Sequence, residues 1–266
     1  MPQQIKIRCY QELNDFLPQQ RRYKTFDIES KKVRSVKDLI ESIGIPHTEI
    51  DLIFVDGESV DFSYQVHHND SINVYPVFEL LPEKVRIELL PLKPTFRHCQ
   101  PPTLAKPRFV LDVHLGRLAA YLRMLGFDTL YKNDCDDPTL ADLSALEQRI
   151  LLTCDRLLLM RKQISYGYFV RSRQPHKQLI EVLSRYGLYK DIKPFTRCMH
   201  CNGNTRAVRK QDIATQLLPK TKKYYDEFYQ CDSCKKVYWQ GSHYLRMQDM
   251  INMVKDDAQK SLLDND

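Results

Sequence analysis

The sequence predicts an α/β protein in three parts: a β-rich N-terminal domain, a central three-layer α/β domain with a mainly parallel sheet, and a C-terminal part built around four cysteines. Two apolar runs, 109–111 and 149–153, are each followed by an aspartate and a helical pattern, which is typical of βαβ units. Strand patterns surround a single helix in the first 80 residues. Two Cys-x2-Cys pairs near the other end indicate a metal-stabilised module.

Residues 1–80 form the predicted N-terminal domain. Ser35 is placed to cap its helix, which ends at Gly44. Four segments are predicted strands: 4–10, 23–28, 52–55 and 71–76. This order resembles a ubiquitin-like β-grasp, and its details resemble the small sulfur carriers of that fold. Because such carriers end in Gly-Gly and this chain continues as Val77-Phe-Glu-Leu-Leu-Pro82, we expect a docking module or a structural cap rather than sulfur carriage.

The central α/β domain is predicted over 108–193, after a linker at 81–107. The linker holds six prolines and is expected to be semi-extended. The first strand of the domain, 109–111, ends at Asp112, and open α/β sheets place ligands at the carboxyl ends of their strands. Asp112 is equally suited to cap the helix that follows, because aspartate is a preferred N-cap residue. On this residue alone both interpretations stay open.

Further acidic residues follow the other predicted strands. Asp155 follows the second apolar run after one intervening residue, Cys154. Three more precede a helix that starts at Pro138: Asp134, Asp136 and Asp137. Since the carboxyl ends of parallel strands meet at one edge of a sheet, these carboxylates are expected to gather there. Carboxylates gathered without basic partners repel one another, and they are tolerated when they bind a hard cation such as Mg²⁺ or Mn²⁺.

Three stretches between about residues 108 and 250 resemble the Mut7-C family in order and spacing: Asp112-x-x-Leu115-Gly116-Arg117-Leu118-Ala119, Leu122-Arg123-x-Leu125-Gly126-Phe127-Asp128-Thr129, and Arg149-Ile-Leu-Leu-Thr153-x-Asp155. That family is a PIN-like group of predicted metal-dependent RNases with an appended zinc ribbon, and a ubiquitin-like domain is also found in front of it. The resemblance implies an endo- or exoribonuclease in which Asp112, Asp137 and Asp155 are catalytic and hold Mg²⁺ or Mn²⁺. Asp134 and Asp136 are weaker candidates, with a turn or capping role as the alternative.

One stretch departs from the family pattern. Mut7-C sequences commonly carry acidic residues after the fourth strand, whereas residues 171–176 here are Arg-Ser-Arg-Gln-Pro-His. The site is then expected to hold one metal ion rather than two, or to be inactive. Cys154 also stands where the family usually has arginine, and it is expected to fill space, because buried cysteine mostly behaves as a small hydrophobic residue.

Basic residues are unevenly distributed along the chain. Between Arg156 and Lys223 there are sixteen lysines and arginines against three acids, a net charge of +13, and the remainder carries −7. A basic half suggests a polyanion partner such as RNA, with a solvated surface as the alternative. For Arg123, the alternative to an RNA contact is packing or a surface ion pair. Eight residues are predicted RNA contacts: Arg117, Arg123, Arg156, Arg161, Lys162, Arg206, Arg209 and Lys210.

Four cysteines predict a structural zinc site: Cys198, Cys201, Cys231 and Cys234. Two Cys-x2-Cys pairs direct four thiolates at one ion, as in tetrahedral zinc sites. The zinc ribbon is predicted over 194–254, followed by a polar, disordered tail at 255–266. Basic and aromatic residues are interleaved in the ribbon, which suits single-stranded nucleic acid, although the aromatic residues are equally suited to form its small core.

Composition sets the remaining expectations. No stretch approaches the roughly 18 consecutive apolar residues of a membrane span, and the N-terminus lacks the apolar core of a signal peptide. The sequence therefore predicts a cytoplasmic protein without a membrane partner. Three functions are compatible with it: a metal-dependent ribonuclease acting on single-stranded or structured RNA, a catalytically inactive RNA- or ribosome-binding protein, and an adaptor whose ubiquitin-like domain binds another protein.

Overall fold

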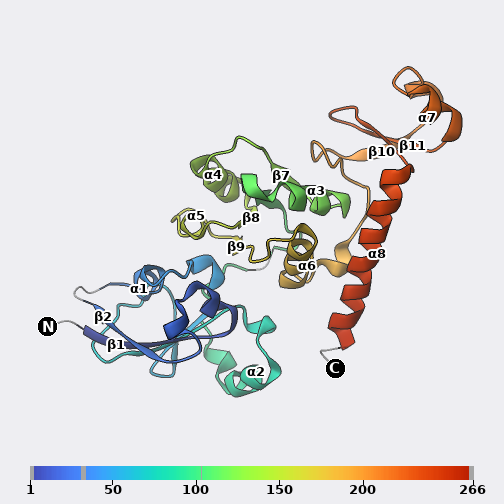
Figure 1. The fold of residues 1–266 in the computed structure, drawn as a ribbon. Coiled ribbons are helices and arrows are strands. Elements are labelled where there is room, and N and C mark those ends of the chain that lie inside the picture. The colour runs from blue at the N-terminus through green and yellow to red at the C-terminus, as the bar shows by residue number, and fades with distance from the viewer. Residues whose placement is uncertain (1–2, 31–33, 103, 264–266) are drawn as a thin grey trace. The chain divides into compact units, whose positions relative to one another are not determined.

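Residues 3–30, 34–102 and 104–263 are described by the structure, a computed structural model (Figure 1). The chain divides into two units, Met1–Ala105 with Asp136–Phe169, and Lys106–Cys135 with Val170–Asp266. The first unit contains β1 (Gln3–Cys9), β2 (Phe26–Ser30), α1 (Val36–Ser42), β3 (Leu52–Val55), β4 (Glu58–Val60), β5 (Ser71–Tyr75), α2 (Glu83–Leu89), α4 (Asp137–Glu147), β8 (Ile150–Thr153), α5 (Arg156–Leu159) and β9 (Gly167–Phe169). The second contains β6 (Phe109–Leu111), α3 (Gly116–Met124), β7 (Thr129–Tyr131), α6 (Pro175–Arg185), β10 (Thr205–Val208), α7 (Pro219–Tyr224), β11 (Phe228–Cys231), β12 (Val237–Trp239) and α8 (Ser242–Leu263).

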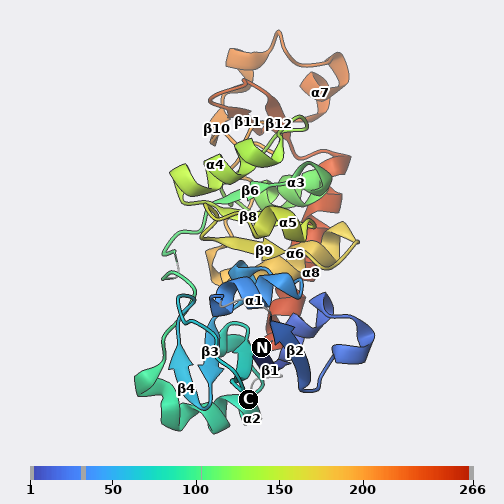
Figure 2. The ribbon, with the colours of Figure 1, turned by 90° about the vertical axis from the view of Figure 1, so that its left-hand side faces the viewer.

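The N-terminal sheet has five strands in the order β2-β1-β5-β3-β4, with β1 and β5 parallel at its centre and the other neighbours antiparallel. Helix α1 lies across this sheet in both views (Figures 1 and 2). It begins as predicted, because the Ser35 hydroxyl accepts the Asp38 amide at 3.1 Å. It ends before Gly44, whose φ of +97° is a conformation that glycine adopts readily. The predicted β-grasp arrangement is thereby confirmed.

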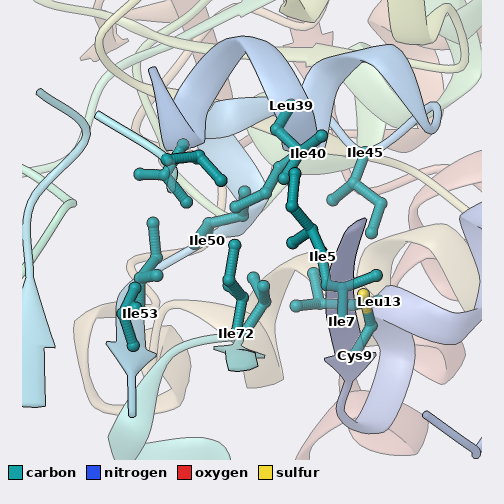
Figure 3. Close-up of a cluster of buried hydrophobic side chains, with 14 of the residues drawn as sticks. Ile5, Ile7, Cys9, Leu13, Leu39, Ile40, Ile45, Ile50, Ile53 and Ile72 are labelled. Atoms are coloured by element: carbon teal, nitrogen blue, oxygen red, sulfur yellow. The ribbon is translucent and has the colours of Figure 1, made fainter. Parts of the chain in front are cut away.

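Two hydrophobic clusters cover the two faces of this sheet. Successive residues of a strand point to opposite faces, so Ile53 and Leu52 of β3 belong to different clusters. The first cluster joins the sheet to α1, and Figure 3 shows Leu39 and Ile40 of the helix above Ile5 of β1 and the neighbouring strands. A sheet covered on both faces is a stable, self-contained unit.

The second cluster includes part of the segment 81–107, which the sequence predicts to be a semi-extended linker. Residues 83–89 form helix α2, and a 3-10 helix (η5, Leu90–Thr95) follows it. Leu81 and Leu89 are buried in the second cluster, and Val85 and Phe96 pack against it. Val85 and Leu89 are four positions apart, so both lie on one face of the helix. Burial of this apolar face favours a helix in spite of the prolines in the segment. Residues 81–96 therefore pack against the sheet and are not a semi-extended connection.

The N-terminal domain is also fastened to strand β9 within the first unit. The 3-10 helix η3 (His47–Glu49) carries the contacts. Glu49 is 2% exposed, and its Oε1 accepts the Phe169 amide at 2.7 Å. His47 Nε2 lies 2.8 Å from the carbonyl oxygen of Ile164. Because the domain packs on another part of its own chain, the structure favours the structural cap over the docking module.

We expect the Glu49→Ala variant to loosen this contact. The Phe169 amide then loses this acceptor, which costs about 1 kcal/mol for a partly buried donor. Glu49→Gln keeps an acceptor oxygen and is expected to cost less. Amide hydrogen exchange at Phe169, with thermal unfolding beside it, measures the difference. Exchange at the wild-type rate in the Glu49→Ala variant would show that this carboxylate does not protect the Phe169 amide.

The middle of the chain supplies parallel strands. Strands β6 and β7 pair in parallel in the second unit, and β8 and β9 do so in the first. Both pairs are parallel, which confirms the predicted parallel strand arrangement. Gly187 ends helix α6 with a φ of +62°, as its position in the sequence predicts. Among the described residues, none of the helices combines the length and apolar content that a membrane span requires.

Helix α8 differs from the predicted disordered tail. It runs unbroken from Ser242 through residue 263 (Figure 1), so 255–263 are helical, and 264–266 lie outside the described residues. Two of its apolar residues, Ile251 and Val254, are buried three positions apart on one face. The Tyr189 hydroxyl also donates to the Asp257 carboxylate at 2.9 Å. These contacts extend the helix beyond the point where its polar composition suggests an end.

Candidate metal centre and acidic site

The four predicted zinc ligands come together in the structure. The sulfur atoms of Cys198, Cys201, Cys231 and Cys234 all lie within 4.8 Å of one another. The Cys198 and Cys234 sulfurs are 3.6 Å apart, and the Cys201 and Cys231 sulfurs are 3.4 Å apart. A disulfide bond is about 2.05 Å long, whereas a tetrahedral zinc site with Zn–S bonds of about 2.3 Å separates its sulfurs by about 3.8 Å. The donor set and its spacing therefore fit a structural zinc ion.

Both Cys-x2-Cys pairs adopt the same turn. The amide after the second cysteine donates to the carbonyl of the first, from Asn202 to Cys198 at 2.9 Å and from Lys235 to Cys231 at 3.1 Å. The amide of each first cysteine then donates to a carbonyl five residues later, at 2.7 and 3.0 Å. Asn202 and Lys235 both have positive φ, +69° and +61°. The backbone itself thus directs each pair of thiols at a common point.

A tyrosine supports one of the ligands. The Tyr238 hydroxyl lies 3.0 Å from the Cys198 sulfur. Burial raises the pKa of the Cys198 thiol, but hydrogen bonds from Tyr238 and from the backbone amides of Cys201 and His200 outweigh it and lower the pKa to about 7. The thiolate is the form that binds metal, so a thiol that ionises near neutral pH is well suited to zinc.

Arg123, a predicted RNA contact, is instead bonded to the first knuckle, the turn formed by residues 198–201. Its side chain is buried, and Nε donates to the Thr129 carbonyl at 2.9 Å. Nη1 donates to the carbonyls of Met199 and His200, the two residues inside the knuckle, at 3.1 and 2.9 Å. A guanidinium bonded to three carbonyls inside the protein is not exposed to a phosphate. The structure therefore favours the packing alternative for Arg123 over contact with RNA.

Asn202 ties the same knuckle to the loop before β7, and sequence reasoning missed it. Its Oδ1 accepts the Thr129 amide at 2.9 Å, and its Nδ2 donates to the Asp128 carboxylate at 2.8 Å. Arg197 donates to the Asn202 carbonyl at 2.8 Å. The available signal was its place directly after a Cys-x2-Cys pair, because asparagine is one of few residues that adopt a positive φ at low cost. Lys235 holds the equivalent place in the second pair, so the signal is weak.

We expect the Arg123→Met variant to lower the free energy of unfolding by about 3 kcal/mol, because it removes a buried guanidinium and leaves one buried and two partly buried carbonyls without a charged donor. The matched control is Arg117→Met, which removes an exposed arginine from the same helix and is expected to stay within about 0.5 kcal/mol. Urea unfolding followed by circular dichroism compares the two. Similar midpoints for both variants would contradict the structural role of Arg123.

Asp112 stands where the sequence places it, directly after β6, and is 6% exposed. It precedes a 3-10 helix (η6, Val113–Leu115). Within the described part of the chain, the Asp112 side chain makes no capping hydrogen bond to this helix. The side chain of Asp112 therefore does not cap this helix, although the residue stands at its N-cap position.

The neighbouring acids Asp136 and Asp137 differ in role: Asp136 caps a helix, and Asp137 does not. Asp136 is the N-cap of α4, and its carboxylate accepts the Thr139 amide at 3.0 Å. Hydrogen bonds from the side chain and then from the backbone amide of Thr139 lower the pKa of Asp136. Asp137 is the first residue of the helix and is half-buried. Asp134 is exposed in the turn before them. The structure thus gives Asp136 the capping role that its sequence context offers and leaves Asp137 as the metal-ligand candidate.

Asp155 is exposed and caps α5, where its Oδ1 accepts the Leu157 amide at 2.8 Å. A carboxylate has two oxygens, so capping through one is compatible with binding a cation through the other. Asp137 and Asp155 belong to the first unit, whereas Asp112 belongs to the second. The convergence of the three acids on one cation stays a prediction.

An acid does reach the basic loop that follows β9. Residues 171–176 contain no carboxylate, but Glu181 of α6 accepts the amides of Arg171 and Ser172 at 2.8 and 3.0 Å. These bonds hold the start of the loop against the helix. Sequence reasoning missed Glu181 because it lies five residues beyond this loop, inside α6.

The other predicted RNA contacts lie on or near the surface. Arg117, Arg156 and Lys162 are exposed, and Arg161 is half-buried. Exposed ion pairs contribute little to stability, so a phosphate can replace the carboxylate in such a pair. The ribbon cations each pair with an aspartate: Arg206 with Asp232 at 2.7 Å, Arg209 with Asp212 at 3.0 Å, and Lys210 with Asp226 at 2.7 Å.

Comparison with protein families matches both parts of the chain. The Mut7-C RNAse domain matches residues 107–251, which contain Asp112, Asp137, Asp155 and the four cysteines, and the Mut7-C ubiquitin domain matches residues 2–81. Neither a curated protein nor a solved structure matches the chain. Since the RNAse-domain match spans more than half of its length, the chain belongs to the Mut7-C RNAse domain family and carries a Mut7-C ubiquitin domain in front of it.

Proposed function

We propose that the chain is a metal-dependent ribonuclease acting on single-stranded or structured RNA. The observation that carries the proposal is the Mut7-C RNAse domain match over 107–251, with Asp112 buried at the end of a parallel strand inside it. Burying a carboxylate is costly unless its surroundings compensate for the charge. A site that binds a hard cation gives such a carboxylate a function, because oxygen ligands are those that Mg²⁺ prefers.

In this proposal Asp112, Asp137 and Asp155 hold Mg²⁺ or Mn²⁺. A divalent cation supplies Lewis-acid stabilisation of the negative charge on a phosphate group. Asp155 is the exposed member of the three, so it is the carboxylate that water reaches most easily and the one suited to accept a proton from the attacking water. Arg117, exposed in the first turn of α3, offers a guanidinium to the phosphate.

Cleavage of end-labelled single-stranded RNA tests the proposal. Products are expected with Mn²⁺ or Mg²⁺ and are expected to disappear when the catalytic metal is withheld. Metal is withheld by dialysis without chelator, and zinc content is measured beside activity, so that damage to the zinc ribbon is not mistaken for loss of the catalytic ion. RNA that stays intact with every divalent metal tried rules out the enzyme.

An inactive RNA- or ribosome-binding protein is the second candidate, and the loop at 171–176 favours it, because its sequence has no acid and Glu181 is bonded to its amides. Such a protein binds RNA without cutting it. In either case we expect the affinity for RNA to fall steeply as salt rises, since phosphate contacts release counterions. Filter binding between about 50 and 200 mM salt measures this slope. An affinity that ignores salt would exclude both candidates.

A further inference from the structure

The ribbon carries a pocket that the acidic site does not use. Its volume is about 270 Å³, and the zinc knuckle, strands β10–β12 and the start of α8 surround it. Five aromatic residues line it: Phe195, Tyr229, Tyr238, Trp239 and Tyr244. Drug-sized ligands occupy pockets of about 300–1,000 Å³, so this volume suits one small ring system better than a peptide segment.

The sheet register explains the flat wall of this pocket. Ala207, Tyr229 and Tyr238 are paired across the three strands, so they form one row on one face of the sheet. Alanine at the end of the row leaves room beside the two rings. The Tyr238 ring is fixed in place, because its hydroxyl lies 3.0 Å from the sulfur of Cys198. A rigid aromatic wall of this kind loses little conformational entropy when a ligand stacks on it.

The rings of this pocket are not the ribbon's hydrophobic core. Phe228, on the opposite face of β11, is 2% exposed, whereas Tyr229 is 40% exposed. Trp239, which is paired with Phe228 and also lines the pocket, is 37% exposed. Large aromatic side chains that are open to water mark a binding surface more often than a fold requirement. The exposed rings therefore point to a ligand with a planar, apolar face.

Charge selects the class of ligand. Two arginines, Arg197 and Arg206, also line the pocket. A cationic ligand such as a quaternary ammonium group, which aromatic cages otherwise bind, is repelled by two guanidinium groups. Arg206 is largely exposed and its partner Asp232 is an exposed acid, so the pair can open for an anion. Aromatic rings beside exposed arginines suit a ring system that is joined to a phosphate, which is the chemistry of a nucleotide.

We propose that this pocket binds one nucleobase of single-stranded RNA, stacked on the Tyr229 ring beside Tyr238, with the adjoining phosphate at the arginine-lined edge of the pocket. The assignment rests on the proposed function, because in it the zinc ribbon binds the RNA that the acidic site cleaves. Base–aromatic stacking tolerates any base, so the pocket adds affinity for unpaired RNA without selecting a sequence.

Trp239 is the only tryptophan of the chain, so its fluorescence reports on this pocket directly. The test titrates the full-length Asp112→Asn protein, in which RNA is not cut, with a single-stranded RNA oligomer and with an abasic oligomer of equal length and charge. The RNA is expected to quench Trp239 and to bind about tenfold or more tightly than the abasic strand. Equal affinity for the two strands, or binding without quenching, overturns the proposal.

Variants in the full chain sharpen the result. Tyr229→Ala is expected to weaken RNA binding about tenfold, and the matched control is Tyr224→Ala, an exposed tyrosine of α7 that does not line the pocket. Unchanged zinc content shows that each variant is folded. Equal losses in both variants, or quenching by tetramethylammonium but not by RNA, contradict a nucleobase site. Cleavage by the wild-type chain is scored separately, so the pocket and the ribonuclease can fail independently.

Discussion

The Cys231→Ser variant is expected to lose its zinc, falling from about one ion per chain to near zero, and to unfold the ribbon. Cys231 is fully buried within the four-sulfur group. Between residues 194 and 241, the buried apolar side chains other than cysteine are Ile213 and Phe228, among the residues that the structure describes. So small a core cannot hold a fold by itself, whereas structural zinc contributes an apparent 10–16 kcal/mol, to order of magnitude.

Atomic absorption measures the zinc, and limited trypsin digestion measures the unfolding. Helix α7 carries Lys220, Lys222 and Lys223, which become cleavable once the ribbon opens. Cys154→Ser is the matched control, because Cys154 is exposed and lies outside the four-sulfur group. It is expected to keep its zinc and its digestion pattern. Unchanged zinc in the Cys231→Ser variant would show that the ribbon is not built on this ion.

Loss of zinc is expected to destabilise residues outside the ribbon as well. The first knuckle supplies two of the carbonyls that bind Arg123, and Asn202 behind it bonds the loop before β7. When the knuckle opens, a buried guanidinium is left with one of its three acceptors. Leaving a buried charge without its partners is strongly destabilising, so α3 and β7 should lose hydrogen-exchange protection with the ribbon. The four-cysteine site is therefore expected to support the α/β unit that carries Asp112.

Local patterns in the sequence were enough for several elements. Ser35 and Gly44 mark the ends of α1, and Gly187 ends α6, because capping and positive φ depend on one or two residues. The four cysteines could be predicted as ligands of one metal ion for the same reason. Their two short spacings predict four thiols at one site, and the structure brings the four sulfur atoms together.

Elements that depend on distant partners could not be predicted in this way. Arg123 meets carbonyls 76 and 77 residues away, and nothing in its own neighbourhood distinguishes such an arginine from one that binds phosphate. The packing of 83–96 on the N-terminal sheet depends on Phe54 and Tyr75, which belong to other strands. Proline content in that segment predicted an extended chain, but tertiary burial outweighed the local preference.

Asp112→Asn is expected to abolish RNA cleavage, lowering the rate by about a thousandfold or more, which corresponds to about 4 kcal/mol of lost transition-state stabilisation. Asparagine has the same size and removes the charge that holds a divalent cation. The variant is expected to fold and to bind RNA as the wild type does, because the change is nearly isosteric. Asp155→Asn is expected to act in the same way. Asparagine caps helices as well as aspartate, so its loss of activity cannot be assigned to a lost cap of α5.

Asp136→Asn is the matched control for both variants. Asp136 stands beside Asp137 in the sequence and caps α4, a role that asparagine preserves. It is expected to cleave RNA at close to the wild-type rate, whereas Asp137→Asn is expected to fall with Asp112→Asn and Asp155→Asn. Rates measured with saturating Mn²⁺ separate the two groups. If Asp136→Asn loses as much activity as Asp137→Asn, the acidic site has been assigned to the wrong residue of the pair; if all four variants cleave like the wild type, the carboxylates do not hold the catalytic ion.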